Sequence, residues 1–133
     1  MVKNMSEQTE YRLASTYMDY SAVQNLTASK GFGHRMPEWP TIMAEREGEP
    51  IGSITINSQI KDALVVGPLV ASNAFVAKRL VDCMDTLLSN LGIKAYVFYV
   101  RTREKRWLSS IRKLDAYKEY YKDDKRVWFR RDL

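Results

Sequence analysis

Residues 63–100, ALVVGPLVASNAFVAKRLVDCMDTLLSNLGIKAYVFYV, decide the fold. The stretch begins with a continuously apolar run, residues 63–66, and ends with a second strand candidate, residues 94–100, that is apolar on both faces after Lys94. Such runs are typical of strands that are covered on both faces. Gly67 and Pro68 follow the first run, and we expect them to disturb that strand because proline cannot donate a hydrogen bond to a neighbouring strand.

A long amphipathic helix is predicted between the two runs. Its apolar residues recur at the spacing of one helical face: Val76, Leu80, Cys83, Met84, Leu87, Leu88 and Leu91. Ser72 or Asn73 can cap the start of the helix, and Gly92 suits the position just past its end. We expect Cys83, which lies on the apolar face, in the core. The two flanking strands are then parallel neighbours joined by a crossover.

Outward from this unit, the sequence predicts a mixed α+β fold. The other expected elements are strands at 11–15, 41–47, 51–57, 116–121 and 126–130, and helices at 17–29, capped by Thr16, and 103–114. Residues 31–40 form a loop, because glycine and proline interrupt any longer element. We expect a flexible N-terminus, residues 1–10, followed by a single domain, residues 11–133. The element order is β-α-β-β-β-α-β-α-β-β.

The composition excludes several classes of site. With one cysteine, Cys83, and one histidine, His34, the chain has neither an internal disulfide nor a Cys/His zinc site. The longest uncharged stretch, residues 63–77, is too short to span a bilayer, and the N-terminus has no apolar core of a secretory signal. We expect no metal, no membrane contact, and a location in the cytoplasm of a bacterium or a phage-infected host.

Positive charge is concentrated near the C-terminus. Residues 101–133 hold 12 of the 21 basic residues and 6 of the 16 acidic ones, a net of +6 against +5 for the whole chain. Tyrosines and tryptophans are interleaved with these cations, a composition suited to phosphate contact and base stacking. Three interpretations stay open for the basic residues of 101–131: contact with a protein or nucleic-acid partner, contact with the phosphates of a cofactor, or solvated charge on a helix and a hairpin.

The element order, together with VVGPLVASNAFVAKRLV at residues 65–81, resembles the GNAT family of acyl-CoA-dependent N-acetyltransferases over almost the whole chain. The segment is similar to the family's V-x-P-x-x-[RQ]-x-x-G-x-[GA] motif followed by a helix. The resemblance implies a GNAT-like, centrally splayed sheet that admits acetyl-CoA. In the family, the fourth strand pairs with the pantetheine arm, and the loop after it surrounds the pyrophosphate.

The resemblance implies that backbone groups of two short segments bind the cofactor. They are Val65, Val66 and Gly67 in the strand, and Ala71, Ser72, Asn73, Ala74, Phe75 and Val76 at the helix start. Three of these positions depart from the motif. Ala71 stands where an arginine or glutamine is usual, Ala74 takes the place of the first glycine, and Val76 takes the place of the second small residue. Glycine suits such a loop because no side chain then blocks the approach of a phosphate to the backbone N–H groups.

Candidate catalytic residues also come from the resemblance. Glu45 and Glu47 lie on a strand where some members place the acid that deprotonates the amine. Tyr117 is the phenol nearest to the position of the family's general acid, and His34 lies in the loop on the acceptor side of the cleft. For the two glutamates and for His34, a solvated surface position remains the other interpretation.

The implied function is acetyl-CoA-dependent acetylation of a primary amine on a small molecule or a protein. A second interpretation is a catalytically inactive GNAT-like protein, similar to compact members from bacteriophages. Such a protein would act in the virion or on the host by binding protein or nucleic acid.

Overall fold

The computed structural model describes residues 8–58 and 64–133, so the expectation for residues 1–7 and for Ala63 lies outside the described residues. The elements are β1 (Thr9–Leu13), α1 (Tyr17–Ser29), β2 (Ile42–Arg46), β3 (Glu49–Asn57), β4 (Val65–Ala71), α2 (Ala74–Asn90), β5 (Ala95–Arg101), α3 (Lys105–Arg112), β6 (Tyr117–Lys122) and β7 (Arg126–Asp132). Their order confirms the predicted α+β fold. Expected and observed bounds differ by at most two residues, except at the C-terminal end of β4.

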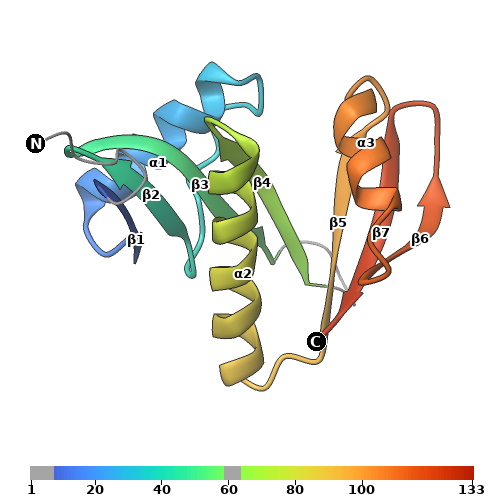
Figure 1. The fold of residues 1–133 in the computed structure, drawn as a ribbon. Helices are drawn as coiled ribbons and strands as arrows, with labels where there is room; N and C mark the ends of the chain where they lie inside the picture. Colours follow the sequence, from blue (N-terminus) through green and yellow to red (C-terminus); the bar gives the residue numbers. More distant parts are fainter. Residues whose placement is uncertain (1–7, 59–63) are drawn as a thin grey trace, which may run out of the picture.

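All seven strands form one sheet in the order β1-β2-β3-β4-β5-β7-β6. Figure 1 shows α2 and α3 in front of the same face of this sheet, α2 over the β3–β4 region and α3 over β5 and β7. The helix α1 packs on β3 and β4 from the other side. The β4–β5 pair is parallel, as predicted, and the other neighbouring pairs are antiparallel.

The start of α1 is set by a capping box that the sequence signals through Thr16. The Asp19 N–H donates to the Thr16 hydroxyl at 3.1 Å, and the Asp19 carboxylate accepts from the backbone N–H groups of Ser15 and Thr16. These exchanges satisfy N–H groups that have no acceptor inside the helix. The Arg12 guanidinium, followed by the Ser15 N–H, holds the pKa of Asp19 well below its usual range.

The strand β3 forms the centre of the core. Its residues 52–56 are all buried, including the polar Ser53 and Thr55. Ile54 and Ile56 pack in a cluster with residues of α2. On the other face, the Thr55 hydroxyl lies 2.7 Å from the Thr41 hydroxyl, so this buried polar group is hydrogen-bonded. Helices on both sides of a central strand account for burial of both faces.

Gly67 and Pro68 disturb the strand, as expected, but the predicted end of the strand at residue 66 is wrong. The strand β4 continues to Ala71, because the register between β3 and β4 shifts at this point. Gly67 and Pro68 lie together opposite the single β3 residue Thr55, which is the arrangement of a β-bulge. Proline is tolerated at a bulge since no ladder hydrogen bond is required of it there. The φ of Gly67, +138°, is one that favours glycine.

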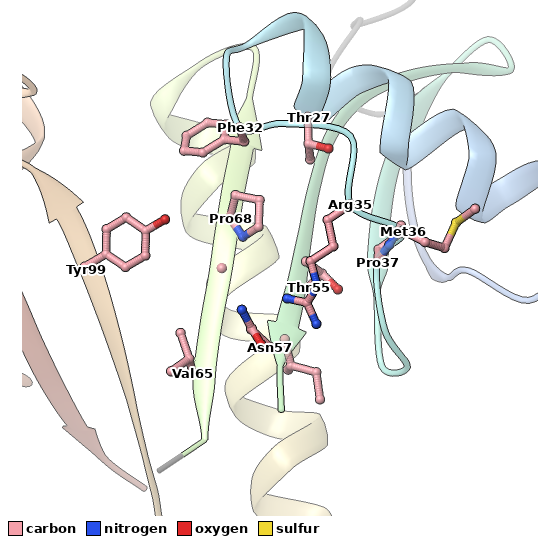
Figure 2. Close-up of a pocket in the computed structure, with 12 residues that line it drawn as sticks. Thr27, Phe32, Arg35, Met36, Pro37, Thr55, Asn57, Val65, Pro68 and Tyr99 are labelled. Carbon is pink, nitrogen blue, oxygen red and sulfur yellow. The ribbon is translucent and has the colours of Figure 1, made fainter. Parts of the chain in front are cut away.

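The sheet splits between β4 and β5. In the described residues the two strands share a single register pair, Val65 with Val97, next to which the Val97 N–H donates to the Leu64 carbonyl at 2.9 Å. Past this pair the strands diverge (Figures 1 and 2). The predicted central splay is therefore confirmed, and it leaves one edge of β4 open beside β5.

Candidate functional site

The open edge of β4 is the first component of the site. One edge of the strand is paired with β3 as far as Ala71, and the other has no strand beside it after Val65 in the described part of the chain. Along a strand, backbone groups point to the two edges in alternation, so β4 presents unbonded N–H and C=O groups to the opening. Val65, Val66 and Gly67, the expected cofactor-binding residues of the strand, lie at the base of this edge.

The first turn of α2 is the second component. Asn73 is the N-cap, and its side chain accepts from the Val76 N–H at 2.9 Å. The Ser72 N–H donates to the Ile51 carbonyl at 2.9 Å. The N–H groups of Ala74 and Phe75 are the first two of the helix, where no acceptor exists inside the helix. This end of α2 carries the positive pole of the helix dipole and has no acidic residue in its first turn.

One of the departures from the motif, Val76, is explained by the packing around α2. Val76 is 1% exposed, and its side chain points into the core rather than toward the open edge. A Cβ placed on Gly52 would lie 3.1 Å from Val76 Cγ1, so glycine in β3 makes room for the valine in α2. Ala74 is exposed and small. Phe75 is 59% exposed. The Val76 side chain therefore leaves the space in front of the helix start open. The backbone N–H groups of Ser72 and Val76 are already bonded within the chain.

A cavity of about 120 Å³ lies on the α1 side of the opening. Figure 2 shows its walls: the loop after α1, the ends of β3 and β4, and Tyr99, which faces Pro68 across the opening. The lining residues are Thr27, Phe32, Arg35, Met36, Pro37, Thr55, Ile56, Asn57, Val65, Gly67, Pro68 and Tyr99. Among these described residues none is a carboxylate, and the charge is that of Arg35, which is paired with Glu38.

Glu38 fastens the loop that forms one wall of the cavity. Its carboxylate accepts from the Ser58 N–H at 3.1 Å and from the Ser58 hydroxyl, and it pairs with Arg35. Burial acts to raise the pKa of Glu38, but the hydrogen bonds from Ser58 and Arg35 outweigh it and leave the pKa below its usual value. The Glu38 carbonyl accepts from the Thr55 hydroxyl at 3.1 Å. The wall is thus bonded to β3.

The structure does not bring Glu45, Glu47 or His34 to the cavity. The Glu45 carboxylate is paired with Arg12, which also binds the carboxylate of Asp19. Glu47 is exposed in the turn between β2 and β3, with a φ of +53°. His34 is exposed, and its backbone carbonyl accepts from the Gln24 side chain. The ion pair of Glu45 could not be read from the sequence, since its partner is 33 residues away.

Two tyrosines lie near the opening on opposite faces of the sheet. Tyr117 is half-buried on the face of α2 and α3, with its ring edge-on to Phe98 at 5.2 Å. Burial, and then the Asp85 carboxylate, raise the pKa of Tyr117, so its phenol keeps its proton at neutral pH. Tyr99 lines the cavity, and sequence reasoning missed it. The signal was the alternation of β5, which places Tyr99 on the face opposite Phe98.

Neither a metal site nor a transmembrane helix is found in the part of the chain that the structure describes. No three His, Cys, Asp or Glu side chains lie close enough together to hold an ion. None of the described helices combines the length and the apolar character needed to cross a membrane. Cys83 is half-buried, packs against the main core, and has a pKa raised by burial.

Comparison with known proteins finds similarity in structure rather than in sequence. No protein-family model matches the chain, and no curated protein does so. An N-acetyltransferase from Staphylococcus aureus has 14% identity and a TM-score of 0.73, with 93% of this chain and 98% of that chain covered. An acetyltransferase from Streptococcus agalactiae has 11% identity and a TM-score of 0.70, with 96% and 99% covered. The PaiA N-acetyltransferase from Thermoplasma acidophilum, solved with coenzyme A, has 13% identity and a TM-score of 0.67, with 94% and 99% covered.

Proposed function

We propose that this chain, which has the fold of the GNAT N-acetyltransferases, binds acyl-CoA between β4 and β5 and transfers the acyl group to a primary amine. The observation that supports this most is the continuity of the open β4 edge with the free N–H groups of Ala74 and Phe75. An extended chain with amide groups can add to a strand edge by backbone hydrogen bonds. A pyrophosphate suits the positive end of a helix.

Acyl-CoA fits this part of the chain through backbone groups of two segments. Residues 65–71 would hold the pantetheine arm, and residues 72–75 would lie around the pyrophosphate, with Ala74 and Phe75 donating. Lys78 and Arg79, both exposed in the next turn of α2, add positive charge beside these donors. When bound, acyl-CoA supplies an activated thioester. The amine would approach from the cavity on the α1 side, whose wall is held in place by Glu38.

Tyr99 is the residue we assign to proton transfer. Its side chain extends from β5 toward Pro68 of β4 and lines the cavity (Figure 2). As the amine nitrogen bonds to the acyl carbon, the carbon–sulfur bond breaks, and the Tyr99 hydroxyl can give its proton to the sulfur. The Tyr99 phenolate then takes up the proton that the nitrogen loses, which leaves an amide, a free thiol and the tyrosine in its starting form. Tyr117, the candidate from the sequence, is enclosed by Phe98 and Arg131 and has a raised pKa, so it is less suited to giving up a proton.

Ala74→Glu tests the phosphate site without weakening the helix. A carboxylate at the first position of α2 favours the helix dipole but repels a pyrophosphate. We expect the Kd of acetyl-CoA, measured by isothermal titration, to rise at least tenfold, while the melting temperature is unchanged or higher. The matched control is Ala74→Gln, which has nearly the same size without charge and should bind within a few-fold of the unmodified protein. Equal affinities of the Glu and Gln variants would remove the helix start from the site.

A second candidate function is binding without catalysis. Two observations favour it: the Ser72 and Val76 N–H groups are already bonded within the chain, and no carboxylate lines the described cavity to accept a proton from an amine. In this case the protein would act on a protein or nucleic-acid partner, in a virion or in a host cell. Acetyl-CoA that binds but gives no acetylated product, across a panel of small amines and amine-bearing peptides, would favour this function.

A further inference from the structure

One face of the C-terminal half of the sheet carries a row of aromatic rings between two rows of cations. The register pairs Tyr99 with Trp128 and Trp128 with Tyr121, so three rings lie side by side across β5, β7 and β6. On one side of this row Arg101 pairs with Arg126. On the other side Arg130 lies between Val97 and Lys118. We call these eight residues the open face.

The alternation of side chains shows that α3 does not cover the open face. Val127 and Phe129 of β7 are buried in a cluster with Leu108 of α3. Neighbouring residues of a strand point to opposite faces, so Trp128, and with it the open face, points away from α3. Figure 1 shows α3 in front of β5 and β7, while α1 lies beside the β1–β4 half of the sheet. Tyr121 is 55% exposed, and Lys118, Arg126 and Arg130 are exposed.

The rings and the cations of the open face are organised by contacts with one another. The Tyr99 and Trp128 ring centroids are 5.1 Å apart, and the Arg126 guanidinium lies 4.9 Å from the Tyr99 centroid. Arg101 lies over the Phe32 ring at 4.2 Å and is 3.4 Å from Glu104. The distance between rings on adjacent strands is therefore close to the distance between the strands, about 4.8 Å.

The charge of the open face is positive after its ion pairs are counted. Its acidic neighbours include Asp132, which is 2.8 Å from Arg130 and 3.8 Å from Lys118, and Glu104, which is 3.4 Å from Arg101. The Arg126 guanidinium lies over the Tyr99 ring, and the Arg126 backbone N–H donates to the Asp123 carboxylate at 2.7 Å, so the four cations have three carboxylates beside them. Basic residues thus flank the aromatic row on both sides. If the bases of a nucleic acid lie on the rings, its phosphates can reach these cations.

We propose that the open face binds single-stranded nucleic acid, with bases stacked on Tyr99, Trp128 and Tyr121 and phosphates near Arg126, Arg130 and Lys118. Rings on a sheet surface stack on any unpaired base, and cations along the row follow the backbone. A duplex hides its bases from such rings, so the surface suits single strands. An acidic polypeptide would use the cations alone and leave the aromatic row without a partner. This site shares Tyr99 with the opening but takes none of its residues from β4 or α2, so nucleic acid can bind there without acyl-CoA.

The test is fluorescence anisotropy with a labelled single-stranded oligonucleotide of mixed pyrimidine sequence, and with a duplex of the same length, over a series of salt concentrations. We expect the single strand to bind more tightly, with log Kobs falling with log salt at a slope near −2, from about −0.7 for each of three phosphates. Tyr121→Ala should weaken binding about 5- to 100-fold, from the loss of one stacked base. Arg126→Gln/Arg130→Gln should reduce the slope by about 1.4.

Matched controls make the result specific to the open face. Lys105→Gln/Arg106→Gln removes the same charge from α3, and Tyr17→Ala removes from α1 a ring that is more exposed than Tyr121, at 77% against 55%. Neither should change binding more than twofold. Circular dichroism of each variant checks that the fold is kept. The proposal fails if no single strand binds at low salt, if the duplex binds as tightly, or if the α3 variant loses as much affinity. Competition by poly-glutamate as effective as by the unlabelled strand would assign the surface to acidic polypeptides and overturn it.

Discussion

Tyr99→Phe should lower kcat for acetyl transfer by about 10²- to 10⁴-fold while leaving the Kd of acetyl-CoA unchanged, as expected for loss of a positioned proton donor. The substitution removes the hydroxyl that lines the opening but keeps the ring against Trp128 and under Arg126. Folding and nucleic-acid stacking are therefore retained. The measurement is steady-state kinetics of free thiol release with the best amine found, together with calorimetric binding of acetyl-CoA.

Tyr117→Phe is the matched control for this experiment. It removes a phenol of the same kind from the opposite face of the sheet, where the hydroxyl is half-buried near Phe98 and Asp85. Its kcat should stay within about threefold of the unmodified protein, far less than the effect of a catalytic proton donor. If instead Tyr117→Phe abolishes turnover and Tyr99→Phe does not, the proton donor lies on the α2 and α3 side, as the resemblance to the family suggested from the sequence.

Gly52→Ala should lower the free energy of unfolding by about 1–3 kcal/mol, as overpacking of a closed core does. The added Cβ would lie 2.8 Å from the Val70 carbonyl oxygen, a backbone atom that cannot rotate away. It would also meet Leu80 at 3.0 Å and Val76 at 3.1 Å. The strain falls where α2 packs on β3 and β4, so we expect acetyl-CoA affinity to fall as well. Urea denaturation followed by tryptophan fluorescence measures the change.

Ser53→Ala provides the adjacent control for this substitution. The Ser53 hydroxyl is buried and has no hydrogen-bond partner in the described residues, so its removal should be neutral or stabilising. A Gly52→Ala variant as stable as the unmodified protein would show that the close packing of β3 against α2 is not needed to hold the helix start beside β4.

The sequence predicted what depends on local patterns. The bounds of α1 and the cap at Thr16 follow from residues next to one another, and the parallel strands follow from two apolar runs around one helix. The C-terminal end of β4 was not predicted. Whether a strand can continue past Pro68 depends on a bulge in its register with β3, and the residues of β4 alone do not determine that register. The sequence signal of such a bulge is a glycine before the proline, and this pair does not distinguish a bulge from the end of a strand.

Within the candidate site, the segments that are local in sequence could also be predicted, and the contacts between distant residues could not. The segments from Val65 to Gly67 and around Ala74 could be placed from the motif because they are close in sequence and the helix follows the strand directly. The cavity could not be predicted, since its lining combines Arg35 from a loop with Thr55 and Tyr99 from separate strands. The basic end of the chain looked uniform in sequence. Pairing of β7 with β5 and β6 then separated its cations onto two faces.

The central claim is that the open edge of β4 and the first turn of α2 bind acyl-CoA. Its most direct test is a titration of the isotopically labelled protein with acetyl-CoA, followed by the chemical shifts of assigned backbone amides. We predict saturable shifts that are largest at Val66, Gly67, Ala74 and Phe75, with small ones at Tyr121 and Arg130. The absence of shifts at millimolar acetyl-CoA, or shifts confined to residues 117–132, would contradict the claim.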